Sequence, residues 1–355
     1  MLNVPINGAR AVKFARRLID KYQLDCTGLT ILTEAASGAY LYNPLIALMA
    51  GAHRVITFCR DSHYGRADEV REAMEATYVE VGLQDAYEFR VALTRQDLAD
   101  ADIVTNSGHL RPFDANFLEG LKDTAVIPLM WEPWELRPGE IDIDVAKRRG
   151  ILILGTNEHE APCDLRPYSF LTALHIAMTH KASIADDRVL VIGEQFTLAL
   201  PIEEGFHRIG VACRRLSPGA SQQEAEEAAR WATYIVVAEH ADHRRLIGSG
   251  GLVETQVLVE SGTTGVGVLS GSVDRDDLEA QGISVYPSTI APAGYMSYMP
   301  SELGPYPVME LFAAGIKVGQ TMARARLRGL SVSEAAKYSL ENSPAMDLEG
   351  DMAWI

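Results

Sequence analysis

The sequence predicts an α/β protein of two Rossmann-like, doubly wound parallel-sheet domains with a cleft between them. First, 355 residues exceed what one hydrophobic core usually serves. Second, short apolar runs alternate with segments of helical periodicity along most of the chain, which is the order of βαβ units. Third, those runs are continuously apolar, which is typical of strands buried on both faces of a parallel sheet.

The first cycle of alternating elements opens with an amphipathic helix over Ala9–Tyr22. A turn of small residues at Ala35–Ala39 follows the first strand. The expected elements after the opening helix are a strand at Leu29–Thr33, helix at Pro44–Ala50, strand at Arg54–Cys59, helix at Ala67–Val81 and strands at Phe89–Leu93, Ile103–Asn106, Val126–Met130 and Ile151–Leu154.

A long helix at Leu165–His180 precedes the second cycle. That cycle comprises a strand at Val189–Ile192, helix at Ala199–Ile209, strand at Val211–Leu216, helix at Gln222–Trp231, strands at Tyr234–Ala238 and Val257–Glu260, helix at Asp274–Gln281 and strand at Ile283–Tyr286. Pro287–Pro307 is rich in Pro, Gly, Ser and Tyr and predicts a loop or hinge, after which helices are expected at Val308–Arg328 and Ser331–Leu340. We expect one domain over 1–160 with 300–355 and a second over 161–299.

Composition limits the classes of partner. Hydrophobic residues make up 47% and charged residues 23% of the chain, as in ordinary globular proteins. The net charge of -16 disfavours nucleic acid and anionic membrane surfaces, so a small-molecule substrate is expected. The four cysteines form no C-x-x-C pair, which predicts neither a disulfide framework nor a metal site. No signal peptide or membrane-spanning segment is expected, so the prediction is a cytoplasmic protein.

Three segments carry a family resemblance: ADADIVTNSG, FLEGLKDTAVIPLMW and IDIDVAKRRGILILGTN, which together cover the region around Asp100–Asn157. In order and spacing they resemble the end of the first domain of D-isomer-specific 2-hydroxyacid dehydrogenases. The resemblance implies an NAD(P)-linked oxidoreductase that acts on a small acid or amino-acid-like metabolite. It also implies that the cofactor lies in the second domain and that the protein is a homodimer.

The cofactor turn departs from the dinucleotide fingerprint G-x-G-x-x-G, because only Gly193 of its three glycines is present. Gln195 places a side chain where phosphate is expected. Arg214 and Arg215 end the next strand, where arginine suits the 2′-phosphate of NADP; two solvated arginines are the alternative. We therefore expect NADP or NAD near Gly193, Gln195, Arg214 and Arg215.

The catalytic residues of the family are also missing from their matching positions. Ser270 stands where the family has the arginine of an R-G-x-V-D turn. The region Thr289–Gly294 contains no histidine where the family has T-P-H. Ordinary 2-hydroxyacid oxidation is therefore disfavoured.

Another set of polar residues follows strands of the first domain, at the edge where open α/β sheets bind ligands. Glu132 lies in the segment Trp131–Glu135, and Glu158 and His159 follow the strand Ile151–Leu154. Imidazole titrates near neutrality, so His159 between carboxylates is the preferred acid–base group, with Glu132 and Glu158 beside it. An exposed polar loop is the alternative.

The sequence carries three weaker patterns. Ser261, Thr263 and Thr264 follow the expected strand at Val257–Glu260 and predict an anion-binding, cofactor-contacting turn; a plain Gly-rich connection is the alternative. Glu34 and Asp61 follow two strands in a pattern loosely similar to the S-adenosylmethionine site of Rossmann-type methyltransferases.

The third pattern comprises Glu239, His240, Asp242 and His243, which have the residue types of metal ligands. A charged helix start is the preferred interpretation, and no metal is expected.

Three hypotheses follow. The first is a diverged NAD(P)-linked oxidoreductase-like enzyme. The second is a non-redox enzyme such as an S-adenosylmethionine-dependent transferase. The third is a catalytically inactive binding protein on the same scaffold, because a fold alone does not determine a function.

Overall fold

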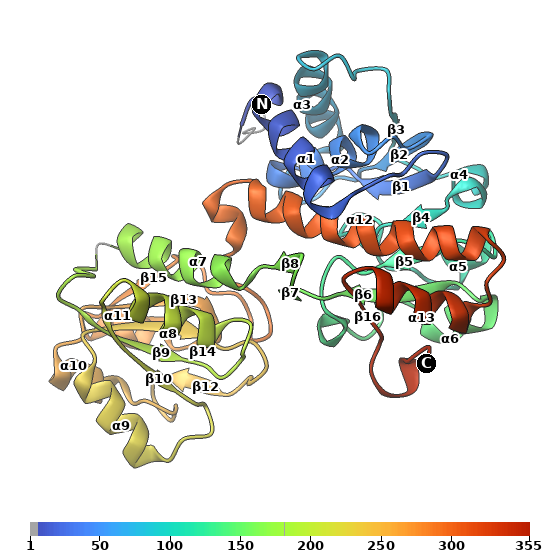
Figure 1. Ribbon diagram of the computed structural model, residues 1–355. Coiled ribbons are helices and arrows are strands. Elements are labelled where there is room, and N and C mark those ends of the chain that lie inside the picture. Colours follow the sequence, from blue (N-terminus) through green and yellow to red (C-terminus); the bar gives the residue numbers. More distant parts are fainter. Residues whose placement is uncertain (1–5, 181) are drawn as a thin grey trace. The chain divides into compact units, whose positions relative to one another are not determined.

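The computed structural model describes residues 6–180 and 182–355. The chain divides into two compact units, each with its own sheet (Figure 1). Unit 1 contains the described residues up to Asp164 together with Gly304–Ile355, and unit 2 contains the described residues of Leu165–Leu303.

Unit 1 is built on a seven-stranded sheet in the order β16-β6-β5-β4-β1-β2-β3. The strands are β1 (Thr30–Glu34), β2 (Arg54–Phe58), β3 (Glu88–Arg90), β4 (Ile103–Val104), β5 (Val126–Pro128), β6 (Leu152–Thr156) and β16 (Ala345–Met346). All pair in parallel except β16, which is antiparallel to β6. Strands β1 to β6 therefore have the doubly wound order 3-2-1-4-5-6, whose order reverses between β1 and β4.

Helices cover the sheet of unit 1. They are α1 (Gly8–Tyr22), α2 (Asn43–Met49), α3 (Ala67–Val79), α4 (Arg95–Asp100), α5 (Ala115–Gly120), α6 (Ile143–Arg149), α12 (Tyr306–Leu327) and α13 (Val332–Asn342), with 3-10 turns η1 (Gly38–Tyr42), η2 (Pro133–Glu135) and η4 (Gly350–Met352). Helix α12 packs across β4, β5 and β6 and against α1 (Figure 1). It is apolar around most of its circumference because both of its sides are covered. A short antiparallel pair, β7 (His159–Glu160) and β8 (Cys163–Asp164), ends the first part of the unit.

Unit 2 has a five-stranded parallel sheet in the order β10-β9-β11-β13-β15. Its elements are α7 (Arg166–Thr179), β9 (Arg188–Ile192), α8 (Ala199–Arg208), β10 (Ala212–Leu216), α9 (Gln222–Trp231), β11 (Tyr234–Ala238), β12 (Arg245–Ile247), α10 (Thr255–Ser261), β13 (Gly265–Ser270), β14 (Ser272–Val273), α11 (Arg275–Ala280), β15 (Ser284–Tyr286) and η3 (Pro300–Leu303). The order 2-1-3-4-5 is the other doubly wound arrangement, and it reverses between β9 and β11.

The central strands of unit 2 are buried on both faces. In β9, Leu190 and Ile192 belong to one apolar core, while Val189 and Val191 belong to the core on the opposite face. Successive side chains of a strand point to opposite faces, so a strand between two cores must be apolar at every position. The two Rossmann-like α/β folds predicted from the continuous apolar runs are confirmed.

The strand expected at Val257–Glu260 is wrong, because these residues belong to helix α10. Val257 and Leu258 are buried, whereas Val259 is 38% exposed. A short apolar run does not by itself distinguish a strand from a half-buried helix. The strand lies instead in the Gly-rich segment that follows, as β13.

Among the described residues, no helix has both the length and the apolar character needed to span a bilayer.

Candidate functional site

The polar residues that follow β5 and β6 lie at neighbouring strand ends of unit 1. Glu132 precedes the 3-10 turn η2, and His159 begins β7. The N–H of Thr156 donates to the carbonyl of Trp131 at 2.9 Å, which holds the two loops together where the strands end. The structure thus brings together the three residues that the sequence predicted as catalytic: Glu132, Glu158 and His159.

Glu132 is the centre of this group. Its side chain is buried, with 4% of the residue exposed. Oε1 lies 2.6 Å from Nδ1 of His159 and also accepts the backbone N–H of Glu158 at 3.2 Å. Oε2 accepts the indole N–H of Trp134 at 2.7 Å. Two N–H donors and the imidazole of His159 therefore converge on a carboxylate withdrawn from water.

Two further carboxyl groups, those of Glu158 and Glu135, lie near Glu132 and have raised pKa values. Burial raises the pKa of Glu158 well above its ordinary value, and the negative charges of Glu135 and Glu132 raise it further. Oε1 of Glu158 is buried and has no hydrogen-bond partner among the described residues. Burial, followed by the charge of Glu132, raises the pKa of Glu135 to about 7. Both groups therefore hold protons at pH values at which an ordinary glutamate has lost its own.

This arrangement is suited to acid–base chemistry. A carboxylate that accepts from Nδ1 of an imidazole fixes the tautomer and the ring orientation, so that proton exchange takes place at Nε2. Neighbouring titratable groups whose environments push their pKa values apart are typical of acid–base sites. We name Glu132, Glu135, Glu158 and His159 the acid–base cluster.

The cofactor turn of unit 2 begins at Gly193, at the point where the order of the sheet reverses. A Cβ on Gly193 would overlap the carbonyl oxygen of Ala238, and the backbone there has a φ of +157°. Glycine is therefore required for the close crossing of the two chain segments. Gly193 supports the geometry of the turn, as the first glycine of the dinucleotide fingerprint does.

Several donors of that turn and of the helix start after it are already used within unit 2. The carboxylate of Glu239 follows β11 and accepts the N–H of Glu194 at 3.1 Å and the side-chain amide of Gln195. The first N–H groups of α8, those of Ala199 and Leu200, donate to the carbonyl of Gln195 at 2.9 and 3.2 Å. Pro201 comes next and has no N–H.

A dinucleotide diphosphate therefore does not fit these residues as they are arranged. Phosphate binding at such a turn needs backbone N–H groups and a helix N-terminus directed at the ligand. Here the N–H of Glu194 is directed at Glu239, and those of Ala199 and Leu200 are directed at the carbonyl of Gln195. Glu194 adds a second carboxylate, which accepts the hydroxyl of Ser217 at 3.0 Å.

Arg214 and Arg215 lie on the edge strand β10, and each has a partner within unit 2. The guanidinium of Arg214 lies 4.4 Å from the ring centre of Trp231. Arg215 Nε is 3.0 Å from a carboxylate oxygen of Glu203 on α8. Consecutive strand residues point to opposite faces, so the two arginines do not converge on one ligand.

The structure does not bring Ser261, Thr263 and Thr264 together with Gly193. Ser261 ends α10, and the two threonines immediately precede β13. They lie at the amino ends of the strands, whereas Gly193 follows the carboxyl end of β9. The hydroxyl of Thr264 donates to the carbonyl of Thr233 at 2.9 Å, also at the amino edge. Ligands of open α/β sheets bind at the carboxyl edge.

The pair that suggested S-adenosylmethionine has structural partners. Glu34 is 3% exposed and accepts the N–H of His109 at 2.9 Å. Asp61 accepts the N–H of Ala67, the first residue of α3, at 2.8 Å. Asp61 therefore caps a helix, and nothing in this pair favours S-adenosylmethionine.

Glu239 to His243 form a loop before β12, so the helix start expected there is wrong. The carboxylate of Glu239 accepts the backbone N–H groups of Ala241 and Asp242 at 2.8 and 3.0 Å, which closes this loop on itself. Across the described residues, no group of three or more His, Cys, Asp or Glu side chains has a geometry that could hold a metal ion.

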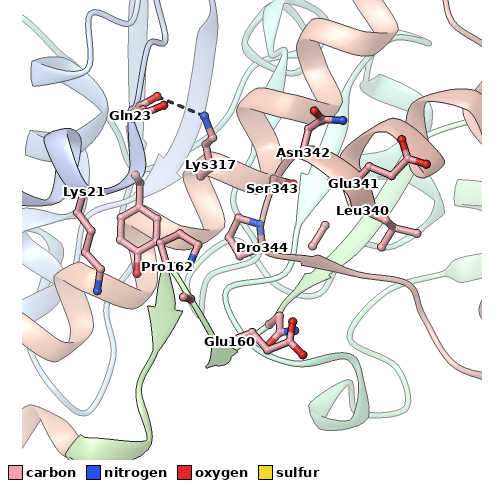
Figure 2. A pocket seen from close by; sticks show the side chains of 14 residues that line it. Lys21, Gln23, Glu160, Pro162, Lys317, Leu340, Glu341, Asn342, Ser343 and Pro344 are labelled. Atoms are coloured by element: carbon pink, nitrogen blue, oxygen red, sulfur yellow. Dashed lines mark hydrogen bonds between the residues drawn. The ribbon is translucent and has the colours of Figure 1, made fainter.

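Unit 1 also has a pocket of about 450 Å³ beside the β7–β8 pair (Figure 2). Lys317 on α12 donates to the carbonyl of Gln23 at 3.3 Å, and Lys21 forms an ion pair with Glu310. Glu160 lines the pocket, whereas its neighbour His159 is on the opposite face of β7. The pocket is therefore separate from the acid–base cluster.

Sequence reasoning missed two functional features. Glu239 was grouped with metal-ligand types, although an acidic residue directly after a buried strand at the reversal point is a signal for a group that faces the cofactor turn. Glu135 was noted only as part of its segment. Its raised pKa depends on burial beside Glu132, which no sequence pattern reveals.

The fold defines a two-unit Rossmann-like α/β protein, and the residues of the acid–base cluster lie at neighbouring strand ends of its first unit. No protein-family model matches the chain, and neither does any curated protein. Among solved structures, the chain is similar to a subunit of dipicolinate synthase from Bacillus halodurans, with a TM-score of 0.50 at 10% identity over 81% of this chain and 96% of that chain. This likeness shows a shared fold.

Two further solved structures belong to proteins named as a reductase and a dehydrogenase. A glyoxylate reductase from Paecilomyes thermophila has a TM-score of 0.41 at 11% identity, over 85% of this chain and 97% of that chain. A 3-phosphoglycerate dehydrogenase in Entamoeba histolytica has a TM-score of 0.38 at 11% identity, over 85% and 97%. A D-2-hydroxyisocaproate dehydrogenase is also among the matched structures, with a TM-score of 0.36 at 11% identity.

Proposed function

We propose that the protein is an enzyme that carries out acid–base chemistry on a small-molecule substrate, with His159 as the group that takes up and releases the proton. The observation that carries this proposal is the 2.6 Å contact between His159 Nδ1 and the buried carboxylate of Glu132. Glu158 and Glu135 support it, because their raised pKa values add neutral acids beside that pair.

Within this class we propose an oxidoreductase-like role on a small acid or amino-acid-like metabolite. The two doubly wound sheets support such a role in general terms, since the scaffold is common among enzymes of that kind. The cofactor turn at Gly193 does not present the donors that a dinucleotide needs, so NAD or NADP stays a prediction. The acid–base step does not depend on that prediction, because an imidazole can exchange a proton with a substrate oxygen or carbon whether or not a hydride also moves.

The test uses exchange and turnover together. Small hydroxy, keto and amino acids are incubated with the protein in D2O, with and without NADH or NADPH, and deuterium incorporation and product formation are followed by NMR. We expect catalysed exchange or turnover with at least one substrate, and a loss of about 10²–10⁴-fold in His159→Gln.

His53→Gln is the matched control, because His53 is exposed and lies at the amino end of β2, away from the cluster. It should retain the full rate. Equal rates in His159→Gln and the wild type would contradict the assignment of His159. No activity with any substrate would favour the inactive binding protein.

A further inference from the structure

We infer that the turn from Gly193 to Ala199 in unit 2 is an anion site already filled by the chain's own Glu239 carboxylate, which excludes the phosphates of a nucleotide cofactor. The inference goes beyond the proposed function and does not depend on it, since it concerns binding in unit 2 and not proton transfer in unit 1.

The hydrogen bonds to Glu239 are the first argument. Its carboxylate accepts from the N–H of Glu194, the amide of Gln195, and the N–H groups of Ala241 and Asp242. Converging N–H donors from the turn after the first strand are what a phosphate oxygen takes in a dinucleotide-binding fold. In this unit they surround a carboxylate instead.

The position and burial of Glu239 are the second argument. Glu239 directly follows β11, the neighbour of β9 across the reversal of strand order, and only 2% of it is exposed. That reversal is where open α/β sheets take their ligands. A phosphate at the same donors would meet a buried negative charge in a medium that screens it poorly, so binding would require the displacement of Glu239.

The helix that follows provides no alternative donors. Ala199 and Leu200 direct their N–H groups at the carbonyl of Gln195, and Pro201 has none. The partial positive charge of the helix end is therefore shielded by a backbone carbonyl. The usual anion-binding contribution of a helix N-terminus is not available to a ligand here.

Unit 1 also has a buried glutamate at its reversal point, with the strand roles exchanged, which is the third argument. Glu34 ends β1, beside β4, at the reversal point of its own sheet. It is 3% exposed and accepts the N–H of His109, which lies in the segment after β4. In both sheets a buried glutamate therefore accepts backbone N–H groups at the point where a cofactor's phosphates are expected.

The experiment removes the carboxylate of Glu239 and supplies pyrophosphate in solution in its place. Glu239→Ala leaves four donors without an acceptor, so it should melt several degrees below the wild type. Pyrophosphate should restore much of the lost melting temperature and should bind the variant at least about tenfold more tightly than it binds the wild type. The wild type should not respond to millimolar pyrophosphate, NADH or NADPH.

Glu239→Ser is the second variant, because its hydroxyl can accept one of the N–H groups and still leave room for an anion. Should Glu239→Ala not fold, the same rescue is expected in Glu239→Ser. Glu254→Ala is the matched control: the carboxylate of Glu254 accepts the N–H of Gly250 at 3.0 Å at the surface of unit 2, outside the turn, and its removal should create no response.

Two results would overturn the inference. One is wild-type binding of NADH or NADPH that pyrophosphate displaces, because it would mean that the turn is open. The other is a folded Glu239→Ala or Glu239→Ser whose melting temperature does not rise with pyrophosphate.

Discussion

At the residue scale, the proposed chemistry depends on two kinds of carboxyl group within one cluster. Glu132 gains three hydrogen-bond donors as it is buried, whereas Glu158 keeps a buried oxygen without any donor. Burial without donors favours the neutral form of a carboxyl group, in keeping with the raised pKa of Glu158. The hydrogen bonds single out Glu132 as the glutamate that contacts the imidazole.

The raised pKa of Glu135 predicts a pH dependence of stability. Its pKa is about 7 in the folded chain against an ordinary 4.5, so the folded state binds more protons between these values. The stability that this group contributes is present below about pH 4.5 and is lost as pH rises through about 7. Glu158 acts in the same direction.

We therefore expect the melting temperature of the wild type, relative to that of Glu135→Gln, to fall by a few degrees between about pH 5 and pH 8. Calorimetry at a series of pH values measures this difference. Glu227→Gln, on the exposed side of α9, is the control and should follow the wild type. A difference that stays constant with pH would contradict the raised pKa of Glu135.

The three residues that the sequence indicated as catalytic were found by a general rule: polar side chains that follow buried parallel strands gather at one edge of the sheet. The rule places Glu132, Glu158 and His159 near one another, but it does not rank them. Which side chain is buried, and which donor reaches it, depends on tertiary contacts such as that of Trp134 with Glu132. The role of Glu239 was missed for the same reason.

At the element scale, most helices and strands follow from periodicity, and the failure at Val257–Glu260 has a physical cause. A run of only four residues fits both the two-residue period of a strand and the 3.6-residue period of a helix. It therefore cannot distinguish the two kinds of element. Val257 is buried and Val259 is 38% exposed, although a strand would place both on one face, so the burial pattern fits the helix. Burial is a tertiary property.

Close packing of α7 on α8 predicts the effect of a small substitution. A Cβ on Gly205 of α8 would overlap the ring of Phe170, which also packs edge-on against Phe206. Gly205→Ala should therefore destabilise the protein by about 1–3 kcal/mol, although alanine is the better helix former.

Urea unfolding measures this effect. In Gly219→Ala the new atom would meet nothing nearer than Ser217 Oγ at 3.5 Å, so that variant should unfold at the wild-type urea concentration. A Gly205→Ala protein as stable as this control would show that the two helices can move apart without loss.

An ion-pair network joins β2, β3 and α4 in unit 1. The guanidinium of Arg54 lies 2.6 Å from Glu88, 3.1 Å from Asp97 and 2.8 Å from Asp100. Asp97 is 2% exposed, so its negative charge is balanced by Arg54 and Arg90. We expect Arg54→Ala to lower the free energy of unfolding by about 1–3 kcal/mol.

The comparison for that network is Arg66→Ala, since Arg66 pairs with Asp68 in full exposure to solvent. An exposed pair contributes little, so this variant should unfold as the wild type does. Chemical denaturation of both variants at low and high salt measures the difference. An equal loss of stability in the two variants would mean that burial of Asp97 does not matter.

At the scale of the whole molecule, the two sheets have different strand orders, but each has a buried glutamate at its reversal point. The alternation of apolar runs and helices was enough to predict two Rossmann-like folds. It was not enough to predict what fills the cofactor turn, because Glu239 is far in sequence from Glu194 and Gln195, whose N–H groups it accepts. A glutamate at each reversal point is in keeping with the acidic net charge of -16.

The central claim is that Glu132 orients His159 for proton transfer, and the tautomer of His159 tests it without any substrate. In protein labelled with ¹⁵N-histidine, the signal of His159 is assigned by its loss in His159→Gln. We expect the neutral imidazole to carry its proton on Nδ1, next to the Glu132 carboxylate, and this pattern to change in Glu132→Gln. A neutral imidazole protonated at Nε2, unaffected by Glu132→Gln, would contradict the account.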